Sequence, residues 1–194
     1  ISTKIIAITG SCGKTTLKEM LGDCLRKISK VSISPKSYNN KYGVPLSLLN
    51  FEENDDFGIL EVGMDKKGEI DYLSKIIQPD VSVITNINYA HIKNFKSIKH
   101  IALAKSEIIQ NTNPGGYVIL NADDNFFSFH KKKVIQNNLK LISFGIKNKQ
   151  SNIKFLDIKK KKDHFQLWIQ INKVKKYFLV SNNFQNIIYN ILAA

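Results

Sequence analysis

Cysteine is scarce in this chain of 194 residues, which holds only Cys12 and Cys24. Two cysteines exclude a disulfide-stabilised scaffold and a zinc site with four thiolate ligands. No run of about 18 uncharged apolar residues occurs, so the sequence predicts no membrane span. With 43% hydrophobic and 23% charged residues, the composition excludes disorder over the whole length. Because no secretory signal pattern opens the chain, we expect a cytoplasmic location.

Arginine is nearly absent: Arg26 is the single arginine among 29 basic residues, and the formal net charge is +13. The positive excess lies in residues 131–194, which hold 14 lysines and 2 aspartates. Specific readers of nucleic acids depend on arginine's bidentate fork, so we interpret the lysine runs as a solvated face and expect no nucleic-acid partner. The alternative is a basic nucleic-acid-binding module with a vestigial phosphate loop, whose binding would weaken steeply with salt.

Strands and helices alternate over the first 145 residues. The apolar runs Lys4–Thr9, Phe57–Val62 and Val81–Thr85 are typical of buried parallel strands, and helical patterns lie between them. One helix is predicted over about Ser97–Gln110, with Ser97 as its N-cap. After about Gly145, short strands with tight connections indicate antiparallel pairing. The sequence therefore predicts a doubly wound α/β fold with a mostly parallel sheet and a small antiparallel β annex near the C-terminus.

The strongest motif is TGSCGKTT at residues 9–16, which follows a predicted strand and opens a helical pattern. Glycines let backbone N–H groups turn toward a polyphosphate, and the helix N-terminus adds partial positive charge. Lys14 is expected to reach the β- and γ-phosphates, and the Thr15 hydroxyl to bind Mg²⁺. This phosphate loop is a shortened form, because Ile8 stands where the longer form has glycine. The residues expected to contact the nucleotide are Gly10, Ser11, Cys12, Gly13, Lys14, Thr15 and Thr16.

Polar residues follow other predicted strands at the sheet edge where ligands bind in open α/β folds. Glu61 ends an apolar strand, and a buried carboxylate needs a metal ion or an ion pair. We predict metal binding there, with a structural ion pair as the alternative. Asn86 follows the next strand, and His91, five residues further on, is predicted to be functional because it shares this edge. Lys105 lies in a helical pattern whose composition indicates an ordinary surface lysine.

Taken together, these motifs resemble the central ATP-binding domain of the Mur ligase family. The matching segments are ITGSCGKTT (8–16), NNKYGVPLSLL (39–49), LEVGMDKKGEI (60–70), ITNINYAHI (84–92), AKSEI (104–108), VILNADD (118–124) and NILAA (190–194). They occur in family order over nearly the whole chain, which convergence hardly explains. Two features favour the family member that adds D-Ala-D-Ala to a UDP-MurNAc-tripeptide. They are the pair Asn39-Asn40 before GVP and the GEI at 68–70 after Glu61.

The resemblance implies roles for individual residues. Lys14 would hold the ATP phosphates, Thr15 and Glu61 the first Mg²⁺, and His91 a second Mg²⁺. Lys105 matches the lysine that this family carbamylates, and a carbamate supplies the oxygen ligands that Mg²⁺ prefers. Because carbamylation needs a neutral amine, burial or a nearby cation should depress the pKa of Lys105.

Asparagines complete the implied site. Asn39 or Asn40 resembles the family's asparagine near the reacting acyl phosphate, and we predict Asn40 as the catalytic one. Asn190 matches a nucleotide-contacting position. The family's usual His-Asn pair is replaced by Asn186 and Ile187, which alters the implied adenine contacts.

The implied reaction is ATP-dependent amide bond formation in peptidoglycan precursor synthesis. A peptide carboxylate attacks the γ-phosphate to give an acyl phosphate and ADP, and the amine of D-Ala-D-Ala then displaces phosphate. The chain begins at Ile1 and stops inside a predicted helix, so we expect residues 1–194 to be one domain of a longer protein. Without the family's UDP-sugar-binding and C-terminal domains, we expect a monomeric fragment that folds but does not ligate.

Two other ATP-using classes compete with this interpretation. A folylpolyglutamate synthase-like ligase shares the fold and the carbamylated lysine, and the segment Asn39-Asn40 argues against it. A generic kinase or motor ATPase would need an arginine finger, for which Arg26 is the only residue available.

Overall fold

The computed structural model describes residues 3–89, 94–181 and 187–194. Its strands are β1 (Lys4–Thr9), β2 (Val31–Ile33), β3 (Phe57–Glu61), β4 (Val81–Ile84), β5 (Tyr117–Asn121), β6 (Lys140–Gly145), β7 (Ile153–Lys160), β8 (Phe165–Ile171) and β9 (Val174–Val180). Its helices are α1 (Lys14–Leu25), α2 (Gly43–Leu49), α3 (Glu69–Ile77), α4 (Ile98–Lys105), α5 (Glu107–Gln110), α6 (Phe127–Gln136) and α7 (Ile188–Ala193).

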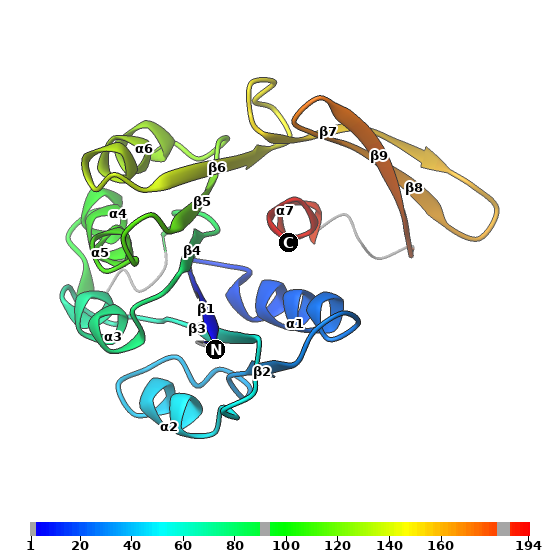
Figure 1. Cartoon of the computed structure of the whole chain (residues 1–194). Helices are drawn as coiled ribbons and strands as arrows, with labels where there is room; N and C mark the ends of the chain where they lie inside the picture. Colours follow the sequence, from blue (N-terminus) through cyan, green and yellow to red (C-terminus); the bar gives the residue numbers. More distant parts are fainter. Residues whose placement is uncertain (1–2, 90–93, 182–186) are drawn as a thin grey trace.

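The strands of these described residues form one sheet in the order β2-β3-β1-β4-β5-β6-β7-β8-β9. The pairs from β2 to β6 are all parallel. Helices α3 to α6 cover one face of the sheet and α1 and α7 the other, as Figure 1 shows. The middle of strand β1 is apolar on both faces because Ala7 packs in one core, while Ile6 and Ile8 pack in the other. The predicted doubly wound, mostly parallel fold is therefore confirmed.

The predicted antiparallel annex is present, and it continues the main sheet. Strand β7 pairs in parallel with the end of β6, through Phe144 and Gly145, and the antiparallel strands β8 and β9 continue from it. This extension passes over α7, which packs against β5, β6 and β7 (Figure 1). The hairpin between β8 and β9 turns at Asn172-Lys173 as predicted, with Asn172 in the left-handed region at φ 54°.

The helix predicted over Ser97–Gln110 is divided into α4 and α5 at Ser106. The buried Ser106 hydroxyl donates to the carbonyl of Leu103 at 2.6 Å. Ser97 occupies the N-cap position of α4 with extended backbone, as predicted. Its hydroxyl pairs with His100 Nδ1 at 3.0 Å and makes no capping bond.

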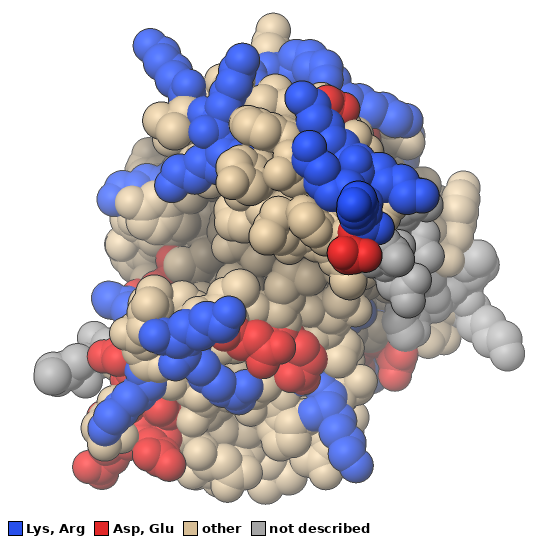
Figure 2. Space-filling model, turned by 90° about the vertical axis from the view of Figure 1, so that its right-hand side faces the viewer, with Lys and Arg blue, Asp and Glu red and all other residues tan. Residues whose placement is uncertain are grey.

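Lysine side chains crowd the surface of the chain's last third. Figure 2 shows blue side chains gathered over the upper part of one face, with acidic side chains mostly below them. The run at 159–162 is exposed at every position, as the predicted solvated face requires. In the described parts of the chain, no helix combines the length and apolarity that crossing a bilayer demands.

Candidate active site

Two glycines give the phosphate loop its shape. Gly10 has φ 147° and Gly13 has φ 83°, values that side chains rarely permit. A Cβ on Gly10 would lie 1.9 Å from Thr85 Oγ1, and one on Gly13 would lie 2.8 Å from Asn190 Oδ1. Glycine is therefore required at both positions for conformation and for space.

The segment after β4 holds the loop in place. The Thr85 hydroxyl donates to the carbonyl of Cys12 at 2.7 Å. The Asn86 side chain accepts from the Cys12 N–H and donates to the Cys12 carbonyl, both at 3.0 Å. The Asn86 carbonyl accepts from the Ser11 N–H at 3.0 Å. The neighbouring strand thus fixes the loop conformation that α1 continues.

Glu61 is the buried centre of the site, with 2% of its surface exposed. The parallel register of β1 and β3 sets it opposite Ile8, directly beside the loop. Its carboxylate accepts from the Thr15 hydroxyl and from the Asn39 amide, each at 2.6 Å, and Lys14 Nζ lies 4.0 Å away. Adjacent carboxylate and hydroxyl oxygens form a donor set that suits a hard divalent cation such as Mg²⁺.

Lys105 is buried, with 2% of its surface exposed, so its interpretation from composition as a surface lysine is wrong. Its amine donates to the carbonyl of Gly10 at 2.9 Å. Lys14, whose amine donates to the same carbonyl at 3.1 Å, is the nearby cation. Burial, and after it the charge of Lys14, lower the pKa of Lys105 to about 7. The depressed pKa that the resemblance implied is therefore present.

The paired asparagines have different partners. Asn39 reaches Glu61 through its side chain, and its carbonyl accepts from the N–H of Gly63 at 2.7 Å. The Asn40 side chain accepts from the N–H groups of Tyr42 and Gly43, both at 3.0 Å, where α2 begins. The geometry joins Asn39 directly to the carboxylate, while Asn40 shapes the entry to α2.

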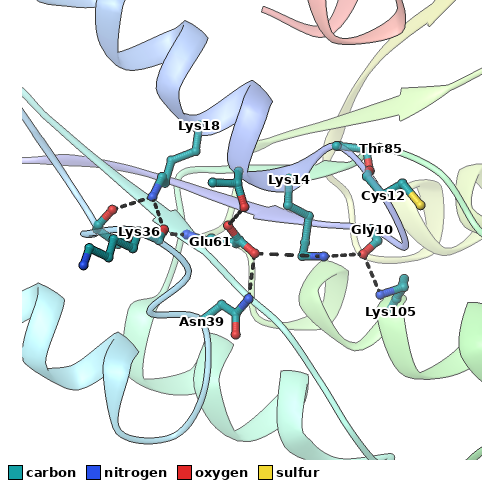
Figure 3. A network of polar contacts seen from close by, with 12 residues as sticks. Gly10, Cys12, Lys14, Lys18, Lys36, Asn39, Glu61, Thr85 and Lys105 are labelled. Atoms are coloured by element: carbon teal, nitrogen blue, oxygen red, sulfur yellow. Dashed lines mark hydrogen bonds and ion pairs between the residues drawn. The ribbon is translucent and has the colours of Figure 1, made fainter. Parts of the chain in front are cut away.

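An open cavity of about 620 Å³ lies in front of these groups. Its lining includes Lys14, Lys105 and both asparagines, together with Tyr42, Tyr72, Lys66 and Lys67 among others. The cavity thus adjoins the phosphate loop at Lys14 and reaches the residues before α3. Figure 3 shows Glu61 between Asn39 and Lys14, with Gly10 and Lys105 beyond Lys14.

The remaining predicted residues are only partly described. Asn190 in α7 donates to the carbonyl of Gly13 at 3.3 Å, which places it on the loop. His91 and Asn186 lie outside the described residues. Within the described ranges, no three His, Cys, Asp or Glu side chains come together. A metal ion bound to this part would therefore depend on mixed ligands such as Thr15 and Glu61.

Three further side chains support the site without a sequence signal that singles them out. Thr85 holds the loop, as described above. Glu107 accepts from the N–H groups of Gly68 and Asp71 and so holds the start of α3, which contributes to the cavity lining. Lys18 is fully buried one turn after Lys14. Glu107 lies in the AKSEI segment and Lys18 just after the phosphate loop, but this proximity does not assign either residue a role.

The sequence profile of the Mur ligase middle domain matches residues 8–194. The UDP-N-acetylmuramoyl-tripeptide–D-alanyl-D-alanine ligase of Buchnera aphidicola subsp. Acyrthosiphon pisum is 43% identical over 159 residues, which cover 82% of this chain and 32% of that protein. The chain spans about a third of the length of the curated relatives it matches.

Solved structures share the fold. The MurF ligase of Thermotoga maritima, crystallised with ADP, matches with a TM-score of 0.88 and 26% identity, covering 99% of this chain and 44% of that one. A mutant FPGS of L. casei matches with a TM-score of 0.70 and 14% identity, covering 98% of this chain and 57% of that one. An identity this low shows the fold alone, so the folylpolyglutamate synthase alternative is supported by the fold only.

Proposed function

The chain belongs to the Mur ligase family, and on this premise we propose that it is the central ATP-binding domain of a ligase that joins D-Ala-D-Ala to a UDP-MurNAc-tripeptide. The observation that carries the proposal is the buried Lys105 amine. It meets Lys14 at the carbonyl of Gly10, and its pKa is lowered to about 7. This is the site that a carbamylated lysine requires, and the tripeptide ligase of Buchnera is 43% identical to the chain.

The phosphate loop is the proposed ATP site. The backbone N–H groups from Gly13 to Thr16 would surround the phosphates at the start of α1, where the helix dipole favours anions, while Asn86 holds the N–H groups of Ser11 and Cys12. Lys14 would contact the β- and γ-phosphates as a cation, and its amine, which donates to the carbonyl of Gly10, lies at the loop. Asn190 packs on Gly13 and is the proposed contact from α7.

The proposed Mg²⁺ ligands are the Thr15 hydroxyl, the Glu61 carboxylate and a carbamate on Lys105, with His91 serving a second ion. Bound Mg²⁺ supplies positive charge that offsets the charge developing on the transferred phosphoryl group. The Thr15 and Glu61 oxygens already face each other at 2.6 Å. Carbamylation joins the neutral Lys105 nitrogen to the carbon of CO₂ and releases one proton.

The reaction forms an amide in two steps. The peptide carboxylate, placed in the cavity in front of Lys14, attacks the γ-phosphate, so that an acyl phosphate forms and ADP leaves. The amine of D-Ala-D-Ala then attacks the acyl carbon, phosphate departs, and the amine loses a proton. Lys14 stabilises the transferred charge, while Asn39 or Asn40 lies beside the reacting group.

The test is phosphate release from ATP by the full-length protein with the UDP-MurNAc-tripeptide, with and without D-Ala-D-Ala. We expect full release only with both substrates, and loss of it in Lys105→Ala. Lys96→Ala, which removes an exposed lysine outside the site, is the matched control. Release with folate and glutamate, and none with D-Ala-D-Ala, would instead assign the protein to the folylpolyglutamate synthases.

A further inference from the structure

Lys18 is a buried cation that the proposed reaction does not use. It lies on α1 one turn after Lys14, and none of its surface is exposed. Its ammonium donates to the carbonyl of Ser34 at 2.5 Å and to the carbonyl of Lys36, and it lies 3.1 Å from a carboxylate oxygen of Glu19. The ammonium therefore makes two hydrogen bonds to backbone carbonyls and one ion pair.

The segment that Lys18 holds contacts Glu61 at both its backbone and its side chain. The Ser34 hydroxyl accepts from the backbone N–H of Glu61 at 3.3 Å, and Asn39, a few residues later, donates to the Glu61 side chain. Lys36 has φ 45°, in the left-handed region that side chains rarely adopt. The hydrogen bond from Lys18 to the Lys36 carbonyl therefore holds this turn, and with it the start of the segment that ends at Asn39. Figure 3 shows Lys18 and Lys36 on one side of Glu61, opposite Lys14.

Stability alone does not account for a charge at this position. A buried ammonium loses its hydration, and a well-packed apolar side chain of similar volume is often at least as stabilising. The carboxylate that pairs with Lys18 belongs to Glu19, whose side chain is 48% exposed. The directional contacts to two carbonyl groups are what an apolar residue could not provide.

We propose that Lys18 is a positioning residue: its ammonium ties α1, which carries Lys14 and Thr15, to the segment from Ser34 to Asn39, and so fixes the Asn39 amide on Glu61. The inference rests on the proposed function, because it assigns Glu61 to the metal that accompanies ATP. Lys18 touches neither nucleotide nor metal in this arrangement. Its removal should leave the phosphate loop intact and disturb the orientation of the Glu61 carboxylate.

The experiment measures ADP binding to the full-length protein by calorimetry, with and without Mg²⁺. In Lys18→Met we expect ADP affinity without Mg²⁺ to stay within about threefold of the wild type. The Mg²⁺ factor, by which Mg²⁺ tightens ADP binding, should fall about 10-fold or more, because a residue that supports a metal ligand has been removed. Lys27→Met, which changes an exposed lysine just beyond α1, is the matched control and should change neither quantity.

A double-mutant cycle separates positioning from a merely structural role. If Lys18 acts through Asn39, then Lys18→Met should change the Mg²⁺ factor less than about twofold in an Asn39→Ala background. The inference would be overturned if the losses of the Mg²⁺ factor in Lys18→Met and Asn39→Ala were additive. It would also be overturned if Lys18→Met left the Mg²⁺ factor unchanged, or if Mg²⁺ did not tighten ADP binding to the wild type. If Lys18→Met does not fold, Lys18→Gln, which keeps amide donors on a shorter stem, is tested by the same criteria. Phosphate release judges the proposed function separately, because the calorimetry needs no ligase substrate.

Discussion

Lys14 and Lys105 donate to one acceptor, the carbonyl oxygen of Gly10, at 3.1 Å and 2.9 Å. Two ammonium groups on one carbonyl repel each other, and a buried amine also loses hydration when it is charged. Lys105 is the more buried of the two, and its burial, followed by the charge of Lys14, lowers its pKa to about 7. The phosphate loop thus lies beside an amine that is partly neutral near pH 7, and a neutral amine can react with CO₂.

Carbamylation should be confined to Lys105 near neutral pH. With ¹³C-bicarbonate, we expect one carbamate resonance in the carbon NMR spectrum of the wild type and none in Lys105→Ala. Its intensity should grow between about pH 6 and pH 8, because the neutral amine fraction rises through a pKa of about 7, whereas ordinary lysines stay protonated. A resonance that persists in Lys105→Ala would place the carbamate elsewhere.

Glu61→Gln tests the metal site while keeping the side-chain volume. The amide still has an oxygen that can accept from Thr15, but it lacks the charge that a divalent cation needs. We expect Mg²⁺-dependent tightening of ADP binding to fall about 100-fold, and phosphate release to fall at least as far. Glu52→Gln, on the loop before β3, is the charge-matched control. Equal losses in ADP affinity with and without Mg²⁺ would argue for a structural ion pair with Lys14 instead.

The sequence predicts the parts of the site that depend on short stretches of chain. The phosphate loop lies between a strand and the start of a helix, and Glu61 ends another strand. Both patterns are visible in the sequence, so their positions at the sheet edge could be inferred. The burial of Lys105 could not, because it arises where the end of α4 meets the loop, a contact set by the packing of the whole domain. Only the family resemblance singled it out.

Adjacent identical residues mark another limit. Asn39 and Asn40 are indistinguishable by type, and which of them reaches Glu61 depends on the turn at Lys36 and on Gly63, where a Cβ would lie 2.7 Å from Asn39 Oδ1. The strands after Gly145 were predicted correctly as antiparallel, but their continuity with the parallel sheet depends on a pairing between β6 and β7 that is only two residues long. Such a short pairing leaves no periodic pattern in the sequence.

Gly13→Ala should damage the loop more than its backbone conformation alone explains. Gly13 and Gly115 both have positive φ, 83° and 74°, but a Cβ on Gly13 would lie 2.8 Å from Asn190 whereas one on Gly115 would meet nothing within 4 Å. We expect each alanine to lower the free energy of unfolding by about 1 kcal/mol through backbone strain. Only Gly13→Ala should also weaken ADP binding, by about 10-fold or more if Asn190 is displaced. Thermal unfolding and ADP titration of both variants would measure the difference; equal ADP affinity in the two would contradict it.

Asp123 should make the fold sensitive to acid. Its carboxylate accepts from the N–H groups of Ile146, Lys147 and Asn148 at 2.6–2.9 Å and from the Tyr189 hydroxyl at 3.1 Å, which joins the β6–β7 connection to α7. Partial burial raises the pKa of Asp123, but these hydrogen bonds outweigh it and hold the pKa below the ordinary value of 3.8. The stabilisation is therefore complete above that value and is lost as the pH falls through the lowered pKa.

Asp123→Asn keeps the shape of the side chain but turns an N–H group toward backbone donors. Near neutral pH we expect it to lower the free energy of unfolding by about 2 kcal/mol, because three backbone N–H groups lose a charged acceptor. Tyr189→Phe, which removes one of the four donors, should cost about 1 kcal/mol, and Asp163→Asn in an exposed turn less than about 0.5 kcal/mol. Chemical denaturation at falling pH is the decisive measurement. The gap between wild type and Asp123→Asn should narrow below about pH 4, where the wild-type carboxylate becomes protonated; a gap independent of pH would show that the carboxylate charge contributes nothing.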